Sequence, residues 1–305
     1  RAASKKDHVA ICGYHGWHDW YLSVNLKNKN NLNAHLLPGL EPLGVPKKLK
    51  NTVHPFSYGN INQLYDIIKK FDLAAVKMEV GRSTLPNVDF INEVRELTAK
   101  KKIILIFDEC TSGFRRTKGG LHLSIKTNPD IAMFGKALGN GFGITAVIGK
   151  TKFMERAKKS FISSTFWTER IGFVAGINTL KTMQKIKSWE KLIKSGKYIN
   201  SQWIKLSKKY ELPIRVSGIE SISQFTFERN HNLYKTFITQ ELLKKKILGT
   251  TLIFLNIYHT KKIIDDYIKE LDKIFCKIKE YEDRKFKGNL LMGGISKNTF
   301  KRLTD

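Results

Sequence analysis

The chain has 305 residues, of which 43 are lysine and 11 arginine, and its formal net charge is +27. No apolar run approaches the roughly 20 residues that cross a bilayer, which argues against a membrane protein. The lysines are scattered rather than gathered in one basic block, so their number alone does not predict a nucleic-acid-binding protein.

The first half of the chain alternates apolar runs with helical spacing. We expect strands at 8–12, 73–80, 103–109, 130–134 and 144–149, and helices at 61–71 and 88–101. A long polar loop with three prolines fills 25–50. Strand–helix–strand alternation predicts an α/β fold with a mostly parallel sheet. Such sheets bind ligands outside the carboxyl ends of their strands.

The pattern changes in the second half. A helix is expected over 166–187 and another over 189–210, followed by a pair of strands within 214–227 around a glycine-containing turn. A helix, a strand over 249–258 and a final helix complete the chain. We therefore predict a large domain over 1–186 and a smaller α+β domain over 187–305.

Three cysteines, Cys12, Cys110 and Cys276, form neither a CxxC pair nor an even disulfide framework. Their number favours a reducing, cytoplasmic compartment and argues against a cysteine metal site. The first residues show neither an initiator methionine nor the layout of a signal peptide, so we expect a fragment or a trimmed chain.

An acid and a lysine follow two of the predicted strands. Asp108 lies at the end of 103–109, and Lys136 follows 130–134 and opens the glycine-rich run ALGNGFG. A strand ending in Asp-Glu is also typical of ATPases. The nearest phosphate-loop candidate, 143–151, has five residues between its glycines where four are needed, and it follows the acidic strand.

A second interpretation pairs the two residues. Pyridoxal phosphate (PLP) needs a lysine that forms a Schiff base and an acid that holds the proton of its pyridine nitrogen. The glycines at 135, 139, 141 and 143 would let the backbone approach a flat ring and a phosphate. Taken singly, each residue has an ordinary explanation, a snorkelling surface lysine for Lys136 and a helix cap or ion pair for Asp108.

Several motifs resemble those of class III aminotransferases of PLP fold type I. These are FDECTSGFR (107–115), PDIAMFGKALGNGFG (129–143), YHGWHDWY (14–21) and SSTFWTERIG (163–172), with GVPKK (44–48) and YHT (258–260) as weaker matches. The resemblance runs over nearly the whole chain. It implies a large PLP-binding domain with a mixed, mostly parallel sheet, partial here because the family has further segments before residue 1.

The resemblance also implies roles for individual residues. Lys136 would form the Schiff base and move the proton, and Asp108 would pair with the pyridine nitrogen. Three more residues would bind the cofactor, namely Cys110 under the ring, Tyr14 on its other face and Thr165 at the phosphate of a neighbouring subunit. The two residues expected to face the substrate are Glu79 and Trp167. His15 is expected to be a packed, structural histidine.

The expected function is transfer of an amino group between a small-molecule amino donor and a keto or aldehyde acceptor, in a homodimer with shared active sites and no metal. The second enzyme that the motifs allow is glutamate-1-semialdehyde 2,1-aminomutase. That enzyme carries a small Gly/Ser-rich gating loop where this chain has its 25–50 loop, which favours the aminotransferase. Two non-enzymatic interpretations stay open, a fragment that binds no cofactor and a basic nucleic-acid-binding protein.

Overall fold

The computed structural model describes residues 1–35, 38–81, 84–163 and 165–297, with only the backbone of Phe166. Two compact units make up the chain. Among the described residues, unit 1 contains Arg1–Val80 and Pro86–Lys185, and unit 2 contains 186–297. Whether 1–186 and 187–305 are separate domains stays a prediction.

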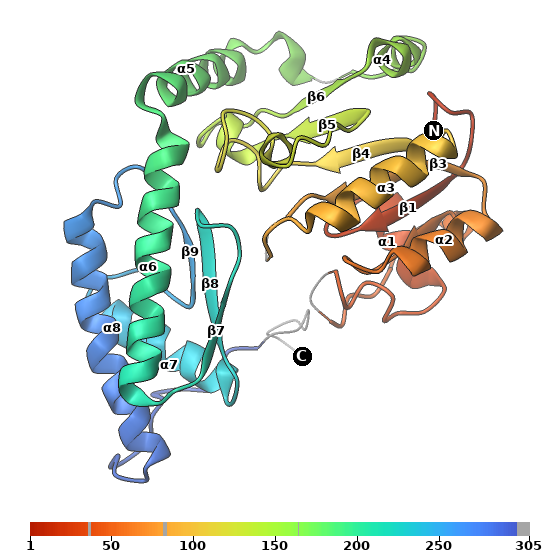
Figure 1. Ribbon diagram of the computed structural model, residues 1–305. Coiled ribbons are helices and arrows are strands. Elements are labelled where there is room, and N and C mark those ends of the chain that lie inside the picture. Colours follow the sequence, from red (N-terminus) through yellow and green to blue (C-terminus); the bar gives the residue numbers. More distant parts are fainter. Residues whose placement is uncertain (36–37, 82–83, 164, 298–305) are drawn as a thin grey trace. The chain divides into compact units, whose positions relative to one another are not determined.

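Unit 1 is built on a six-stranded sheet in the order β2-β1-β3-β4-β5-β6 (Figure 1). The strands are β1 (His8–Cys12), β2 (Val53–Pro55), β3 (Leu73–Glu79), β4 (Ile104–Asp108), β5 (Ile131–Phe134) and β6 (Ala146–Gly149). β2, β1, β3, β4 and β5 are parallel, and β6 pairs antiparallel with β5. The predicted α/β class with a mixed, mostly parallel sheet is therefore confirmed.

Two crossover helices cover one face of this sheet. α2 (Ile61–Lys70) connects β2 to β3, and α3 (Val88–Lys100) connects β3 to β4 (Figure 1). Each begins at an asparagine whose side chain accepts a backbone N–H of the first turn, Asn60 from Gln63 and Asn87 from Phe90. The strands beneath are deeply buried, since six of the seven β3 residues are buried and five of those six are apolar.

Shorter elements complete unit 1. They are α1 (Asp19–Leu22), α4 (Thr151–Ala157), α5 (Arg170–Ile186), and the 3₁₀ turns η1 (Ser23–Leu26), η2 (Lys47–Leu49), η3 (Leu121–Ser124), η4 (Lys136–Leu138) and η5 (Thr165–Thr168). The helix expected over 166–187 is thus interrupted at Glu169, between η5 and α5. Apolar spacing alone does not show where a helix is interrupted.

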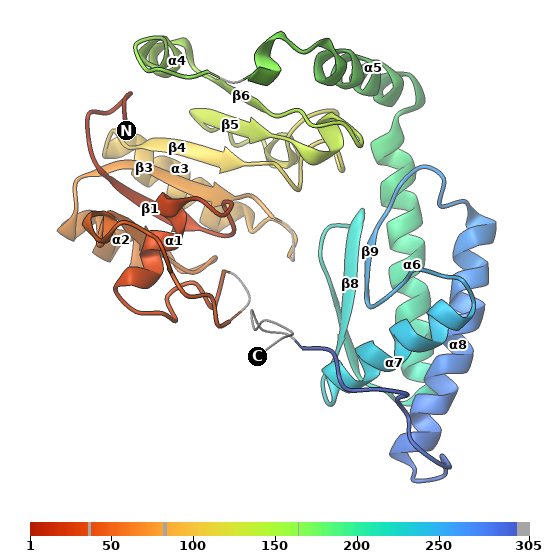
Figure 2. The same cartoon turned by 180° about the vertical axis from the view of Figure 1, so that it is seen from behind.

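Unit 2 packs three helices against an antiparallel three-stranded sheet, β7-β8-β9. Its elements are α6 (Ser188–Tyr210), β7 (Ile214–Ser217), β8 (Ile222–Phe227), α7 (His231–Lys244), β9 (Leu252–Phe254) and α8 (Lys261–Glu282). Figures 1 and 2 show α6 and α8 side by side. Trp203 is fully buried in this core, and its indole N–H donates to the Tyr267 hydroxyl at 3.1 Å.

Apart from small shifts at strand ends, the strand predictions differ from the structure in two places. The strand expected over 249–258 is only Leu252–Phe254, and β2 was not expected at all. β2 is three residues long and ends in a proline, so its place in the sheet comes from pairing with β1 rather than from its own sequence. Within the described residues, no helix is both long and apolar enough to cross a bilayer.

Candidate active site

The carboxyl ends of β3 and β4 place two acids next to each other. Glu79 and Asp108 are partners in the parallel register of these strands, and Asp108 is also the register partner of Met133 on β5. Asp108 is buried, at 8% exposure. The predicted acidic strand end therefore lies at the carboxyl ends of the strands, where sheets of this class bind ligands.

Asp108 is held by three hydrogen-bond donors. Its Oδ2 atom lies 3.0 Å from His15 Nδ1 and 3.0 Å from Lys77 Nζ. Its Oδ1 atom accepts the backbone N–H of Cys110 at 3.2 Å. Both oxygens are therefore engaged, and the carboxylate is fixed in one orientation.

The charges around Asp108 decide its protonation state. Burial by itself raises the pKa of the Asp108 carboxyl, but the hydrogen bond from His15 and the positive charge of Lys77 outweigh burial and hold that pKa well below its usual range. The pKa of His15 is lowered, mainly by burial of its ring and further by the charge of Lys77. Asp108 is consequently an ionised, oriented acceptor at neutral pH.

Lys136 lies in the η4 turn directly after β5. Its backbone has φ +44°, a left-handed conformation that lysine rarely adopts. The side chain is exposed, and its amine donates to the Thr111 hydroxyl at 2.5 Å. Left-handed backbone at a lysine is often found at functional sites, so the conformation fits the predicted role of Lys136.

Cys110 lies between the two predicted partners. Its thiol contacts the backbone of Gly135, where an added Cβ would lie 2.9 Å from the Sγ atom. Burial raises the pKa of the Cys110 thiol, while the charge of Lys136 acts in the opposite direction. Gly135 thus owes its lack of a side chain to close packing on Cys110.

The glycine-rich loop after Lys136 has a local explanation as well. An added Cβ at Gly139 would lie 2.0 Å from the Phe142 carbonyl oxygen, and Gly141 has φ +108°. The tight turn therefore requires both glycines. Gly143 has open space around its Cα atom, so clearance for a ligand stays a prediction there.

The aromatic turn after β1 brings Tyr14 to Glu79. The backbone N–H of Tyr14 donates to Glu79 Oε2 at 3.1 Å, and an added Cβ on Gly13 would collide with the same carboxylate. The Tyr14 ring is half-buried and lies edge-on to Trp17, with centroids 5.5 Å apart. The roles of Tyr14 at a ring and of Glu79 at a substrate stay predictions.

Thr165 and Trp167 lie in η5, and both are exposed. In the described part of the chain, no hydrogen bond or ion pair joins either side chain to Lys136 or Asp108. The roles of Thr165 and Trp167 therefore stay predictions.

Sequence reasoning missed two residues of the site. The pattern predicts a buried strand over LAAVKMEV, and the lysine inside this apolar run is the signal that could have found Lys77. Thr111, three residues after Asp108, gave no signal, because its contact with Lys136 joins two separate strand ends. His15 was expected to be structural, and it lies directly on Asp108.

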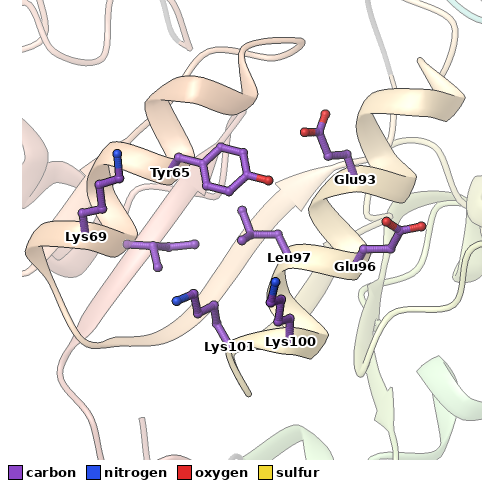
Figure 3. A pocket seen from close by; sticks show the side chains of 8 residues that line it. Tyr65, Lys69, Glu93, Glu96, Leu97, Lys100 and Lys101 are labelled. Atoms are coloured by element: carbon purple, nitrogen blue, oxygen red, sulfur yellow. The ribbon is translucent and has the colours of Figure 1, made fainter.

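Unit 1 also has a hollow of about 460 Å³ between α2 and α3 (Figure 3). α2 contributes Tyr65 and Lys69, and α3 contributes Glu93, Glu96 and Leu97 (Figure 3). The two helices lead from this hollow into the amino ends of β3 and β4. The hollow therefore lies toward the amino ends of the strands, whereas Asp108 lies at a carboxyl end. The mixed charges of its lining are typical of a solvated surface.

Comparison with known proteins identifies the family. The family model described as aminotransferase class-III matches residues 4–273. The chain belongs to the class-III aminotransferases. Two curated relatives are 3-aminobutyryl-CoA aminotransferase of Cloacimonas acidaminovorans, 30% identical over 79% of this chain, and glutamate-1-semialdehyde 2,1-aminomutase of Methanococcus vannielii, 33% identical over 70%. The chain spans about half the length of each, 56% and 51% respectively.

Solved structures share the fold of this chain. The FumI protein of Sphingopyxis sp. MTA144, solved with PLP, aligns with a TM-score of 0.80 at 21% identity, covering 92% of this chain and 67% of that one. An omega-transaminase from Sphaerobacter thermophilus aligns with a TM-score of 0.78 at 18% identity, covering 90% and 69%. At identities of 21% and 18%, these two alignments show that the fold is shared and nothing about function.

Proposed function

We propose that the protein is a PLP-dependent aminotransferase that moves an amino group between a small-molecule donor and a keto or aldehyde acceptor. The observation that carries this proposal is an exposed lysine amine and an ionised, buried carboxylate at the carboxyl ends of two neighbouring strands. Asp108 ends β4 and Lys136 follows the neighbouring parallel strand β5, while Cys110 donates its backbone N–H to Asp108 and packs its thiol near Gly135. The family and the fold of its solved members support the same cofactor.

The residues present fit PLP. A carboxylate offers about four lone-pair positions. His15 and Lys77 use two on Oδ2, and the Cys110 backbone uses one on Oδ1, which leaves one for a ring nitrogen. The amine of Lys136 is exposed, and among the described residues its hydrogen-bond partner is the Thr111 hydroxyl, so it is available to an aldehyde.

Bound PLP supplies an electron sink for the carbanion that forms when an amino substrate loses its α-proton. In this proposal the Lys136 amine binds the cofactor aldehyde and later carries the α-proton. Thr111 orients that amine, and Asp108 holds the proton on the ring nitrogen. Cys110 and Tyr14 would cover the two faces of the ring.

Three further residues complete the proposed roles. Thr165 of a neighbouring subunit would bind the cofactor phosphate, and Glu79 and Trp167 would contact the substrate. Testing these roles requires the assembled protein, because η5 makes no hydrogen bond or ion pair with Lys136 or Asp108 within the described residues.

Borohydride trapping tests the central claim. The protein is incubated with PLP, reduced and mapped by peptide mass spectrometry. We expect the pyridoxyl label on Lys136, its loss in Lys136→Ala, and its retention in Lys118→Ala, a control at an exposed lysine of the same unit. Label spread over surface lysines with Lys136 unmodified would refute the proposal. Salt-sensitive DNA binding at physiological ionic strength would then favour a basic binding protein.

The aminomutase is a second candidate because curated relatives with that name reach 33% identity. Turnover of glutamate-1-semialdehyde without any added donor or acceptor separates the two reactions. We expect little turnover, since the 25–50 loop is long and polar rather than small and Gly/Ser-rich. Rapid turnover would replace the aminotransferase with the mutase.

We also infer a cytoplasmic homodimer. Three free cysteines without a disulfide fit a reducing compartment. Apolar side chains on α5 are more than half exposed, among them Ile171, Phe173, Val174 and Ile177, and a second copy of the chain would cover them. Light scattering should give the dimer mass, and Phe173→Asp should shift it toward the monomer. A monomer in the unmodified protein would contradict the inference.

A further inference from the structure

Lys77 is a buried lysine in the middle of a central strand. It lies on β3, where its exposure is only 7%, and its β3 neighbours Val76 and Met78 are fully buried. A charged ammonium in such a place is costly unless it is paired. Its partner is Asp108, whose Oδ2 atom lies 3.0 Å from Nζ.

The surroundings of this ammonium keep water away. The Lys77 Nζ atom lies 5.5 Å from the centroid of the Trp20 ring, in a cation–π contact. His15 is buried at 4% exposure and lies on the same carboxylate oxygen. The cation and the carboxylate therefore interact in a medium where charges are weakly screened.

We propose that Lys77 is a positioning residue that sets how strongly Asp108 holds a proton on the cofactor ring nitrogen. This inference rests on the proposed function. A positive charge 3.0 Å from Oδ2 makes the carboxylate a weaker proton acceptor. The ring nitrogen should then lose its proton at a lower pH than it would if residue 77 were uncharged. A ring that is protonated less often withdraws electrons less strongly.

The other charges that face Asp108 and Lys77 are fixed by the structure. Glu79 lies on the same strand and edge, His15 comes from the turn after β1, and Cys110 and Lys136 follow β4 and β5. His35, which accepts the Gly13 backbone N–H at 3.1 Å, adds a further titratable ring near His15. None of these groups is altered chemically when only residue 77 is changed.

The experiment uses PLP labelled with nitrogen-15 at the ring nitrogen. The pH at which the bound nitrogen loses its proton is read from its chemical shift in the wild-type protein, Lys77→Met, Lys77→Arg and the control Lys48→Met. Methionine keeps the length and apolar stem of lysine without its charge, and Lys48 is exposed. We expect a midpoint higher by about one pH unit in Lys77→Met, and no change in Lys77→Arg or the control.

A second readout needs no cofactor. Because the charge of Lys77 lowers the pKa of His15, the His15 ring should titrate at higher pH in cofactor-free Lys77→Met, as NMR of the ring protons would show. If Lys77→Met does not fold, Lys77→Gln takes its place in both measurements. The ring-nitrogen result decides the role, and the His15 result shows that the charge acts on this carboxylate.

The outcomes separate the two proposals. Unchanged midpoints for the ring nitrogen and for His15 in Lys77→Met, with Lys136 still labelled, would overturn the role of Lys77 and leave the proposed function standing. Failure to label Lys136 would overturn the proposed function and the cofactor role of Lys77 together. A raised His15 midpoint in that case would show only that the charge of Lys77 acts on His15 beside Asp108.

Discussion

The substitution Asp108→Asn would remove the carboxylate that lies 3.0 Å from the buried Lys77 ammonium. At 3.0 Å and an effective dielectric constant of about 20, two unit charges attract with about 5 to 6 kcal/mol. Desolvation offsets part of this attraction, and removing one partner of a buried pair typically costs about 3–5 kcal/mol. We therefore expect Asp108→Asn to lower the free energy of unfolding of unit 1 by about 3–5 kcal/mol at pH 7.

The penalty comes from the charge that the substitution leaves behind, so removing that charge as well should restore stability. The double variant Lys77→Met/Asp108→Asn, which carries neither charge, should regain at least about 2 kcal/mol at pH 7.

Urea titration of the cofactor-free protein measures these changes when hydrogen exchange is followed peptide by peptide. Peptides from β3 and β4 report on unit 1, and peptides from α6 and α8 serve as the internal reference. Asp66→Asn, an exposed aspartate on α2, is the matched control and should change stability by less than about 0.5 kcal/mol. A stable Asp108→Asn protein, or a double variant no more stable than Asp108→Asn, would refute the reasoning.

Three further predictions concern both units. Burial raises the pKa of Glu241, but hydrogen bonds from two lysine ammonium groups outweigh it and lower that pKa to about 2. The stability that this gives unit 2 should be lost as pH falls from 4.5 to 2. Urea titrations of Glu241→Gln should lack that loss. Burial lowers the pKa of His35 to about 4, so the unfolded state gains a proton first and unit 1 should lose stability as pH falls from 6.5 to 4; a slope unchanged in His35→Gln would contradict this. Gly196→Ala should destabilise unit 2 by about 2 kcal/mol or more in denaturant titrations, because the new Cβ would lie 1.9 Å from the Glu220 carbonyl oxygen; a variant as stable as wild type would show that the backbone yields.

The amino-acid sequence by itself determined the α/β alternation and the two strand ends that carry Asp108 and Lys136. These features are local, because apolar runs mark buried strands and a polar residue that follows such a run lies at the strand's end. Motif resemblance added the family, and the comparisons confirmed it. The sequence also predicted most strands, to within a few residues at their ends.

Only the tertiary structure decided which charges meet. Lys77 faces Asp108 because β3 and β4 pair in the register that aligns Glu79 with Asp108, and no local pattern fixes that register. The Thr111 contact of Lys136 likewise joins two loops that follow different strands. Buried ionisable groups must find partners wherever the chain folds back on itself, so their pairing belongs to the packed structure and not to the spacing of residues along the chain.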